Sequence, residues 1–360
     1  MEKEELNKYI GNPGMSLVEA MKKIDGNGAG ILYIVDGDGR LAGSLSDGDI
    51  RRWIIRTGAL DAKAGEAACG NPICLSEDRA GEGYGIMSAK KLSSLPVLDQ
   101  EGRIQDVVFH SDGNAAQVPA INPEALSGVP VIIMAGGKGT RLYPYTKILP
   151  KPLIPVGETP IIERIMERFV MYGVKRFFLT VNYKKEMIKS YFRELNPEYE
   201  LCYVEEDQPL GTAGSIRLIE EILHSPVVIT NCDTLVQTDY EKLLLYHQES
   251  GNALTIVSSL KNTVIPYGVI HSRGQGIVSS MEEKPSFSFL INTGMYVMNP
   301  EHIQKIPPGK VCHMTDLANR LMADGFKVGM YPVSEESFLD MGEFAEMKRM
   351  EDRMNGSPDN

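Results

Sequence analysis

Short apolar runs alternate with segments whose apolar residues recur at helical spacing, from residue 129 onward. The apolar runs predict strands at 129–135, 175–181, 200–206 and 226–231. The helically spaced segments predict helices at 159–173, 183–195 and 212–223. This alternation is typical of a doubly wound, mostly parallel sheet with helices on both faces. We therefore expect an α/β, Rossmann-like fold here, with ligands at the carboxyl ends of the strands.

The N-terminal part of the chain has a different pattern and contains an internal repeat. The segment VDGDGRLAGSLSDGD at 35–49 recurs as LDQEGRIQDVVFHSD at 98–112, an offset of 63 residues. Each copy is typical of an apolar strand, a glycine-containing turn, a second strand and the start of a helix. The repeat predicts a smaller α+β module built from two copies of one unit.

The segment QVPAINPEALSGVP at 117–130 separates the two patterns. It has three prolines and no sustained periodicity, as is typical of a linker. We predict a two-repeat module over 1–118, a linker over 119–128 and a second domain over 129–360. A length of 360 residues is enough for two or three domains, each with its own core.

Composition excludes several function classes. The net charge is −11 and no basic run is present, so we expect no nucleic-acid partner. No apolar run reaches the ~18 residues of a membrane span, and the N-terminal segment has no apolar signal core, so we expect a cytoplasmic protein without a membrane partner. The five cysteines form no CxxC pair, which favours reduced thiols over disulfides or a zinc site.

Candidate chemistry begins in the loop after the first apolar run of the second domain. The loop reads Gly-Gly-Lys-Gly-Thr-Arg over 136–141. It fits neither a Walker A loop nor the dinucleotide pattern, because Leu142 stands where the last glycine of that pattern belongs. Closely spaced glycines nevertheless let backbone N–H groups approach a phosphate chain. Arg141 and Lys151 would add fixed positive charge beside it.

The second domain closely resembles the sugar-1-phosphate nucleotidyltransferases, also called nucleoside-diphosphate-sugar pyrophosphorylases. The resemblance covers essentially all of 130–350, and its landmarks occur in the family's order. They are AGGKGTRLYP with Arg141, Lys151-Pro152, QPLGTAGS at 208–215, Asp233, PYGVI with Gly268, MEEKP with Glu283 and Lys284, INTGMYV with Asn292, and FLDMG with Asp340.

The resemblance implies that a sugar-1-phosphate oxygen attacks the α-phosphorus of a nucleoside triphosphate and that pyrophosphate leaves. Two anions must meet, so positioning and charge neutralisation dominate catalysis. Asp233 and Asp340 would together hold Mg²⁺ through oxygen ligands, although a single aspartate is more often an N-cap or turn residue. The predicted catalytic residues are Asp233, Arg141 at the triphosphate and leaving group, and Lys151 at the α-phosphate or the leaving group.

The same resemblance implies two sets of binding residues. The nucleotide-binding set is Ala135, Gly136, Gly137, Gly139, Thr140, Gln208, Gly211 and Thr212. The sugar-phosphate-binding set is Gly268, Glu283, Lys284 and Asn292. In the second set, Lys284 would neutralise the sugar phosphate, and Glu283 would accept hydrogen bonds from sugar hydroxyls or an amine.

The N-terminal repeat resembles a tandem pair of CBS domains, regulatory modules that commonly bind adenine nucleotides. The segment Gly43–Asp49 fits the family's Gly-x-x-Ser/Thr-x-x-Asp, which implies that Ser46 contacts a phosphate and Asp49 the ribose. The alternative is that this segment only caps a helix. In the second copy, Asp106 and Phe109 replace Gly43 and Ser46, so we expect at most one nucleotide site. The pair could also serve only in dimerisation.

We infer the base and the sugar from the domain architecture, because no single residue identifies either of them. A CBS pair ahead of this catalytic domain, with LGTAG in the base loop, is similar to guanylyltransferases that act on glucosamine-1-phosphate in legionaminic acid biosynthesis. Relatives of the same build use heptose or mannose phosphates. We expect GTP and glucosamine-1-phosphate as substrates, Mg²⁺ as cofactor, an adenine nucleotide as effector, and a homo-oligomer. Two alternatives remain: a catalytically inert nucleotide-sensing partner, and a cytidylyltransferase acting on a non-sugar phosphate such as phosphocholine.

Overall fold

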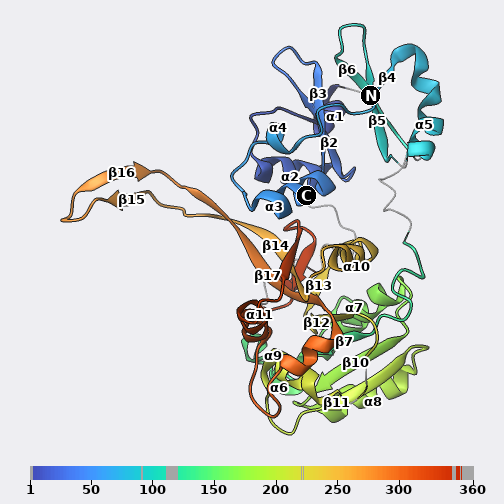
Figure 1. Ribbon diagram of the computed structural model, residues 1–360, viewed down its shortest axis with the longest axis vertical. Helices are drawn as coiled ribbons and strands as arrows, with labels where there is room; N and C mark the ends of the chain where they lie inside the picture. The colour runs from blue at the N-terminus through green and yellow to red at the C-terminus, as the bar shows by residue number, and fades with distance from the viewer. Residues whose placement is uncertain are drawn as a thin grey trace. The chain divides into compact units, whose positions relative to one another are not determined.

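The computed structural model describes residues 3–90, 92–110, 121–219, 221, 223–342, 346–348 and 350 (Figure 1). The chain divides into two compact units. Unit 1 comprises Met1–Ala120 and Leu260–Ile291, and unit 2 comprises Ile121–Ser259 and Asn292–Asn360. Among the described residues, no helix is both long and apolar enough to cross a membrane.

Unit 1 contains two three-stranded sheets of the same design. The first has the order β1 (Ile10–Gly11), β2 (Ile31–Val35), β3 (Leu41–Ser46), and the second β4 (Leu75–Ser76), β5 (Ser94–Leu98), β6 (Ile104–Phe109). In each, the first pair of strands is parallel and the second antiparallel. Ile31 pairs with Ser46, and Ser94 pairs with Phe109, 63 residues further on in both strands. The two repeats therefore share one strand register.

An aspartate and a glycine that are identical between the repeats form the turns of these sheets. The side chain of Asp36 accepts hydrogen bonds from two backbone N–H groups of its turn, and that of Asp99 does the same. Gly39 and Gly102 have φ values of 80° and 81°, which L-residues rarely adopt. The repeated aspartate and glycine are thus explained by turn geometry.

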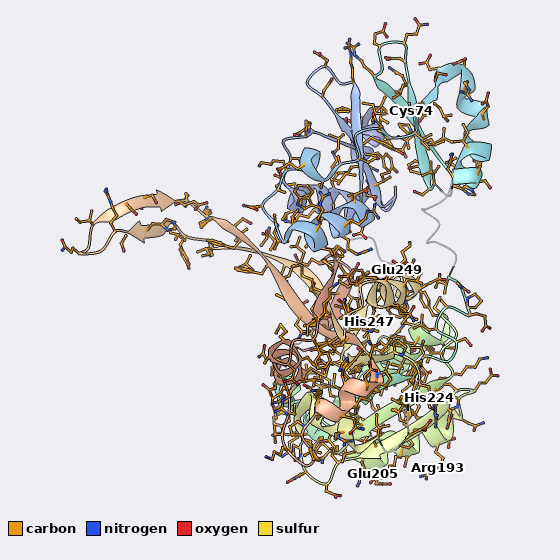
Figure 2. All side chains as sticks on the ribbon, in the orientation of Figure 1. Cys74, Arg193, Glu205, His224, His247 and Glu249 are labelled. Atoms are coloured by element: carbon orange, nitrogen blue, oxygen red, sulfur yellow. The ribbon has the colours of Figure 1, made fainter. Side chains whose placement is uncertain are left out.

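Helices and a buried contact complete the repeat module. The helices are α1 (Lys3–Leu6), α2 (Leu17–Asn27), α3 (Asp47–Thr57), α4 (Ala64–Ala67) and α5 (Gly83–Lys90), with 3₁₀ turns at Asn7–Tyr9 and Glu77–Glu82. The hydroxyls of Tyr33 and Ser94, both buried, lie 2.8 Å apart and join the two sheets. All five cysteines are free, and Cys69 and Cys74 are exposed. Cys74 is labelled in Figure 2.

Unit 2 is built on a seven-stranded sheet. Its order is β11 (Glu200–Glu205), β10 (Arg176–Val181), β7 (Val131–Met134), β12 (Val227–Asn231), β17 (Ser286–Met298), β14 (Leu254–Val264), β18 (Val328–Val333). The first four strands are mutually parallel, β17 is antiparallel to β12, and β18 is parallel to β14. The mostly parallel α/β sheet expected from the sequence is confirmed. The chain proceeds from β7 to one side and returns to β12 on the other, which creates the reversal point where such sheets bind ligands.

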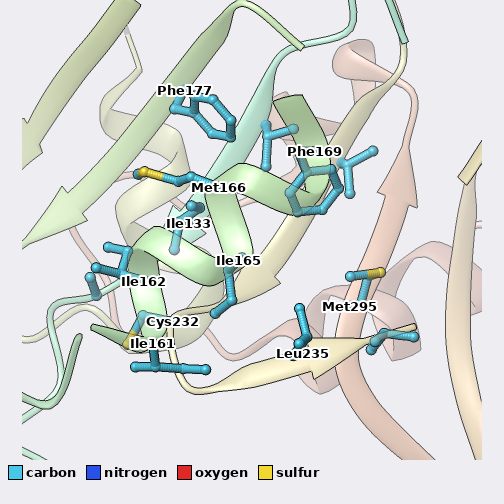
Figure 3. Close-up of a cluster of buried hydrophobic side chains, with 14 of the residues drawn as sticks. Ile133, Ile161, Ile162, Ile165, Met166, Phe169, Phe177, Cys232, Leu235 and Met295 are labelled. Carbon is cyan, nitrogen blue, oxygen red and sulfur yellow. The ribbon is translucent and has the colours of Figure 1, made fainter. Parts of the chain in front are cut away.

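The helices of unit 2 bury the apolar positions that the sequence spacing indicated. They include α7 (Ile161–Val170), α8 (Lys185–Leu195), α10 (Tyr240–Glu249) and α11 (Met314–Ala323). On α7, Ile162, Ile165, Met166 and Phe169 are all buried (Figure 3). The Phe169 ring stacks on Tyr240 with centroids 4.6 Å apart. Burial of each large apolar side chain contributes roughly 1.5–3 kcal/mol, so this face anchors α7 to the sheet.

The helix predicted over 212–223 is the main difference from expectation. The chain forms only a short helix α9 (Gly211–Gly214) and a 3₁₀ turn at Ser215–Leu218, and residues 220 and 222 lie outside the described residues. The backbone N–H groups of Ala213 and Gly214 both donate to the carbonyl of Cys312, at 2.9 and 3.0 Å. Contacts with a distant segment, rather than helical periodicity, therefore determine this conformation.

Shorter elements surround the carboxyl ends of the strands. They are 3₁₀ turns at Thr140–Leu142, Lys151–Leu153 and Pro300–Lys305, helix α6 (Tyr145–Ile148), and strands β8 (Pro155–Val156), β9 (Thr159–Pro160), β13 (Thr234–Val236) and β19 (Phe338–Asp340). Strands β15 (Val269–Ser272) and β16 (Val278–Glu282) form the tip of the hairpin that continues from β14 and β17 (Figure 1). Part of the segment predicted as a linker packs on unit 2, because Leu126 is fully buried in its core.

Candidate nucleotide and phosphate site

A pocket of about 370 Å³ lies in unit 2 at the carboxyl ends of β7 and β12. It contains residues from four separate sequence landmarks, brought together by the reversal of strand order. The predicted residues that line it are Gly136, Gly137, Gly139, Thr140, Arg141, Lys151, Gly211, Thr212 and Asp233. Ala135 precedes the loop and is buried. Gln208 is exposed beside the pocket's Pro209 and is not itself part of the lining.

In the glycine loop, the position of Gly139 accepts only glycine, whereas the position of Gly137 leaves space for a ligand. Gly139 has φ +61°, and a Cβ there would lie 2.9 Å from the Thr146 methyl group and 3.1 Å from Lys151 Cβ. The Thr146 hydroxyl donates to the Gly139 carbonyl at 2.8 Å, which closes the loop. By contrast, no described atom lies within 4 Å of the Cβ position of Gly137. The backbone near Gly137 is therefore open to a ligand.

Lys151 and Asp233 form an ion pair at the floor of this pocket. Their side chains are only 11% and 14% exposed, so water screens the pair weakly. Lys151 begins a 3₁₀ turn between two prolines, Pro150 and Pro152, which restrict the backbone that carries it. Asp233 immediately precedes β13. The pair brings a cation and a carboxylate beside the open glycine loop.

Asp340 is brought next to Asp233 by a strand pairing that sequence spacing does not reveal. β13 and β19 are antiparallel, with Thr234 opposite Asp340, and the Met341 N–H donates to the Asp233 carbonyl at 2.9 Å. Burial raises the pKa of the Asp340 carboxyl, and the negative charge of Asp233 raises it further, whereas Lys151 acts in the opposite direction.

The two carboxylates fit a divalent cation. Asp340 Oδ1 is buried and has no hydrogen-bond partner among the described residues. A buried carboxylate oxygen without a partner is costly unless a cation or donor joins it. Within the described part of the chain, no group of three His, Cys, Asp or Glu side chains is arranged to hold a metal. Mg²⁺ prefers oxygen ligands and takes only one or two of them from protein carboxylates. The two carboxylates would supply these, and phosphate and water oxygens would complete the coordination.

The loop that includes Gly211 is fastened to the segment before α11. Gly211 has φ +78°, and a Cβ there would lie 2.6 Å from the Cys312 carbonyl oxygen. The Met314 N–H donates to the Thr212 hydroxyl at 2.9 Å, and the Cys312 N–H donates to the Leu210 carbonyl at the same distance. The loop is thus fixed in position at the pocket wall.

Glu206 is a pocket residue that the sequence reasoning missed. It is 7% exposed, lines the pocket and accepts a hydrogen bond from the Leu210 N–H at 3.2 Å. Burial raises the pKa of its carboxyl. The adjacent Glu205, labelled at the surface in Figure 2, instead pairs with Lys185 and Lys189. Side chains alternate between the two faces of a strand, so of two neighbouring glutamates at the end of β11 one points inward and one outward. The dipeptide Glu-Glu by itself does not show which of the two points inward.

The predicted sugar-phosphate residues do not line this pocket. Gly268, Glu283 and Lys284 lie on the hairpin of unit 1, where the Cβ position of Gly268 is 3.0 Å from a Glu283 carboxylate oxygen. Lys284 has φ +48°, an uncommon conformation for a residue with a side chain. Asn292, in unit 2, donates to the Tyr296 hydroxyl at 2.7 Å and accepts from the Gly294 N–H at 2.9 Å.

Ser46 and Asp49 form a reciprocal helix cap. Ser46 is the N-cap of α3, and its hydroxyl accepts from the Asp49 N–H at 3.2 Å. Asp49 Oδ2 in turn accepts from the Ser46 backbone N–H at 2.8 Å, and Oδ1 accepts from Arg52 at 2.6 Å. Both side chains therefore take part in the helix cap that the sequence offers as the alternative to nucleotide binding.

Comparison with known families identifies the second domain. The family described as nucleotidyl transferase matches residues 130–354, more than half of the chain. The chain belongs to the nucleotidyl transferase family. A CBS domain is matched at residues 12–56, within the first repeat of unit 1. The resemblance to a sugar-1-phosphate nucleotidyltransferase with a CBS module is confirmed.

Curated relatives of this nucleotidyl transferase are mannose-1-phosphate guanyltransferases. Those of Debaryomyces hansenii and Candida albicans are 36% and 37% identical over 185 residues, which cover 49% of this chain and 51% of each relative. The chain thus spans about half the length of the curated relatives it matches. A solved structure from Bacillus anthracis, assigned as a glucose-1-phosphate thymidylyltransferase in complex with sucrose, shares the fold at a TM-score of 0.50 and 19% identity, over 64% of this chain and 97% of that one.

Proposed function

We propose that this chain catalyses the Mg²⁺-dependent transfer of GMP from GTP to a sugar-1-phosphate, with release of pyrophosphate. The observation that carries the proposal is the convergence of the glycine loop, the Lys151–Asp233 pair and the Asp340 carboxylate, with its buried Oδ1, at one end of the sheet. The family match and the guanyltransferase relatives support the same reaction.

The proposed chemistry depends on neutralising and aligning phosphates. Backbone N–H groups around Gly137 would bind the triphosphate, and Arg141 would stabilise charge on the departing pyrophosphate. Lys151 would contact the α-phosphate once phosphate oxygens compete with Asp233 for its ammonium group. Asp233 and Asp340 would hold Mg²⁺, which supplies charge neutralisation and a template for the phosphates. The sugar-1-phosphate oxygen then forms the new P–O bond as the bond to pyrophosphate breaks.

Glu206 provides the structural argument for guanine. The Watson–Crick edge of guanine offers two neighbouring donors, N1–H and the N2 amino group. A carboxylate accepts two parallel hydrogen bonds and donates none. Glu206 lines the pocket next to the loop of Gly211 and Thr212, where the base is expected. Uracil and thymine offer a single ring N–H on this edge, so an ionised Glu206 favours GTP over UTP and dTTP.

Glucosamine-1-phosphate is the sugar substrate that we propose. Glu283 would accept hydrogen bonds from the sugar amine, Lys284 would neutralise the phosphate, and Gly268 and Asn292 would complete the contacts. Mannose-1-phosphate is the competing candidate, because it is the substrate in the names of the curated relatives.

We further propose that residues 1–118 form a regulatory module that binds an adenine nucleotide at Ser46 and Asp49 and adjusts the activity of residues 129–360. Regulation requires that the nucleotide bind the more and the less active states with different affinities. The conserved strand register of the two repeats supports a single folded module.

A pyrophosphate-release assay with Mg²⁺ tests the reaction. GTP, CTP, UTP, dTTP and ATP are each combined with glucosamine-1-phosphate, mannose-1-phosphate, a heptose phosphate and phosphocholine. We expect the largest kcat/KM for GTP with glucosamine-1-phosphate. Activity with CTP and phosphocholine would instead support the cytidylyltransferase alternative. Silence of every pair, together with GTP binding by calorimetry, would support the inert nucleotide-sensing alternative.

A further inference from the structure

Hydrogen bonds join the start of α8 to the glycine loop by way of the short helix α6. The last carbonyls of a helix have no partner within the helix. In α6, the Lys147 and Ile148 carbonyls accept hydrogen bonds from the Lys184 ammonium group at 2.7 and 2.6 Å. The Thr146 carbonyl accepts from the Tyr183 hydroxyl at 3.2 Å. Two neighbouring residues thus satisfy three consecutive carbonyls at the carboxyl-terminal end of α6.

Thr146 connects α6 to the glycine loop. Its side chain is buried, and its hydroxyl donates to the Gly139 carbonyl at 2.8 Å. The same carbonyl accepts from the Leu142 N–H at 3.0 Å, across the 3₁₀ turn that includes Arg141. Gly139 and Arg141 both line the pocket. The position of α6 therefore determines where the loop presents its backbone N–H groups and its arginine.

Apolar burial contributes little to the position of α6. The helix comprises four residues, whereas isolated helices are already marginal in water at ~12–15 residues. Tyr145 and Ile148 are 52% and 73% exposed. Hydrogen bonds from a charged donor are stronger than those between neutral groups. We therefore expect the position of α6 to depend on the hydrogen bonds from Tyr183 and Lys184.

The backbone of Lys184 has an uncommon conformation. Its φ of 53° and ψ of 35° lie in the left-handed region, which residues with a long side chain rarely adopt. Such strain persists where the surrounding contacts fix it, and it is concentrated at functional sites. We propose that Tyr183 and Lys184 are positioning residues for the triphosphate. They hold α6, and through Thr146 the glycine loop, in the shape that binds the β- and γ-phosphates. This role rests on the proposed function, in which the loop binds a nucleoside triphosphate.

Calorimetric titration of the full chain with GTP and with GMP, each with Mg²⁺, tests the proposal. GMP lacks the β- and γ-phosphates, so it reports on the rest of the nucleotide site. In Lys184→Gly, the ammonium group is removed and the left-handed backbone is kept without strain. We expect the affinity for GTP to fall about 10-fold and the affinity for GMP to change by less than about 2-fold. Tyr183→Phe removes one neutral hydrogen bond and should weaken GTP binding by a smaller factor, about 3.

The matched control is Lys185→Gly. Lys185 is the next residue along the chain, and its ammonium group pairs with Glu205 on the surface. This variant should bind GTP and GMP like the unaltered protein. Amide hydrogen exchange over 139–149 in the ligand-free chain should become faster in Lys184→Gly and stay unchanged in Lys185→Gly. Thermal unfolding identifies a variant that does not fold, and the ratio of GTP to GMP affinity in Tyr183→Phe then decides the question.

An unchanged GTP affinity in Lys184→Gly would overturn the proposal. Equal losses for GTP and GMP would also overturn it, because the residue would then support the fold as a whole. These measurements do not require turnover, so GTP binding without pyrophosphate release would contradict the proposed function and leave the comparison of variants valid. A chain that prefers another nucleoside triphosphate is tested with that triphosphate and its monophosphate. A chain that binds no nucleoside triphosphate would overturn both proposals.

Discussion

Lys151, Asp233 and Asp340 form an unbalanced group of charges at the pocket. One ammonium group faces two carboxylates, and among the described residues its one ion pair is with Asp233. The Arg141 guanidinium lowers the pKa of Asp340 only as a minor influence, against the larger effects of burial and of Asp233. A partly buried carboxylate that lacks its own counter-charge lowers the stability of the fold. Such a cost at one residue is typical of sites that are completed by a ligand.

Replacement of Asp340 should separate stability from activity. In Asp340→Asn, the negative charge that burial and Asp233 disfavour is lost, so the metal-free protein should become more stable, by about 1 kcal/mol. Activity should fall roughly 100-fold or more, and half-saturation should require more Mg²⁺, because a ligand oxygen is weakened. Thermal unfolding in EDTA and a Mg²⁺ titration of the initial rate measure the two effects.

The control for this variant is Asp324→Asn, which removes a surface carboxylate paired with Lys305 at 2.8 Å. It should leave the Mg²⁺ titration unchanged and alter stability by less than about 1 kcal/mol. A loss of both stability and activity in Asp340→Asn would instead mean that the carboxylate has a structural partner.

Glu206 should determine the choice of base. In Glu206→Gln, one acceptor oxygen is replaced by a donor that faces the guanine amino group. We expect kcat/KM for GTP to fall about 10- to 100-fold, and the ratio of GTP to UTP turnover to fall with it. Glu205→Gln is the control, because that exposed side chain pairs with Lys185 and Lys189 on the surface. Equal losses with GTP and UTP would argue that Glu206 supports the loop without contacting the base.

At the scale of elements, the predictable features are those with local causes. The strands and helices of 129–206 follow from periodicity, and the glycine loop follows from its position after an apolar strand, whereas Asp233 follows from the family resemblance. In the described part of 212–223, a short helix and a 3₁₀ turn replace the predicted long helix, because the conformation depends on the carbonyl of Cys312, about a hundred residues away. Asp340 was found through its landmark alone, since the β13–β19 pairing that brings it to Asp233 is non-local. Glu206 was missed because burial, not residue type, gives it a role.

A buried histidine between three elements should make the stability of unit 2 depend on pH. His247 on α10 is 1% exposed, and its ring nitrogens lie 2.8 Å from the Thr255 hydroxyl and 3.1 Å from Asn299 Oδ1. Burial lowers the pKa of His247. The unfolded chain, with a histidine pKa near 6.5, then binds more protons than the folded chain at lower pH. Stability is therefore full above about pH 6.5 and is lost as pH falls towards the folded-state pKa.

Urea unfolding between pH 5 and pH 7.5 measures this effect. The slope from one such group reaches at most about 1.4 kcal/mol per pH unit. His247→Gln should reduce the pH dependence of the free energy of unfolding by the equivalent of up to one proton. The contribution of His302, whose pKa burial also lowers, should remain. His271→Gln, at an exposed hairpin position, is the control and should leave the slope unchanged. An unchanged slope in His247→Gln would show that its protonation is not coupled to folding.

At the scale of the whole molecule, the sequence predicts two kinds of domain, but it does not show to which compact unit the hairpin of residues 260–291 belongs. The repeat of 63 residues is visible because turns and registers recur. Residues 260–291 belong to the compact unit of the N-terminal repeats, although they come from the middle of the matched nucleotidyl transferase region. Local patterns do not encode such an assignment, because it depends on contacts between segments far apart in the chain. Any effect of the CBS module on activity therefore has to be measured with the full chain.

Two equivalent helix caps allow ligand binding to be separated from helix stability. Ser16 caps α2 through Glu19 in the same reciprocal way that Ser46 caps α3 through Asp49. Ser16→Ala and Ser46→Ala should each cost about 1 kcal/mol of stability. Only Ser46→Ala should weaken the binding of AMP or ATP, by about 10-fold, because only Ser46 lies in the Gly-x-x-Ser segment. Calorimetric titration of the full chain measures both nucleotides. If the two variants bind alike, Ser46 serves the helix alone; if the unaltered chain binds neither nucleotide, the module has a role in assembly rather than in sensing adenine nucleotides.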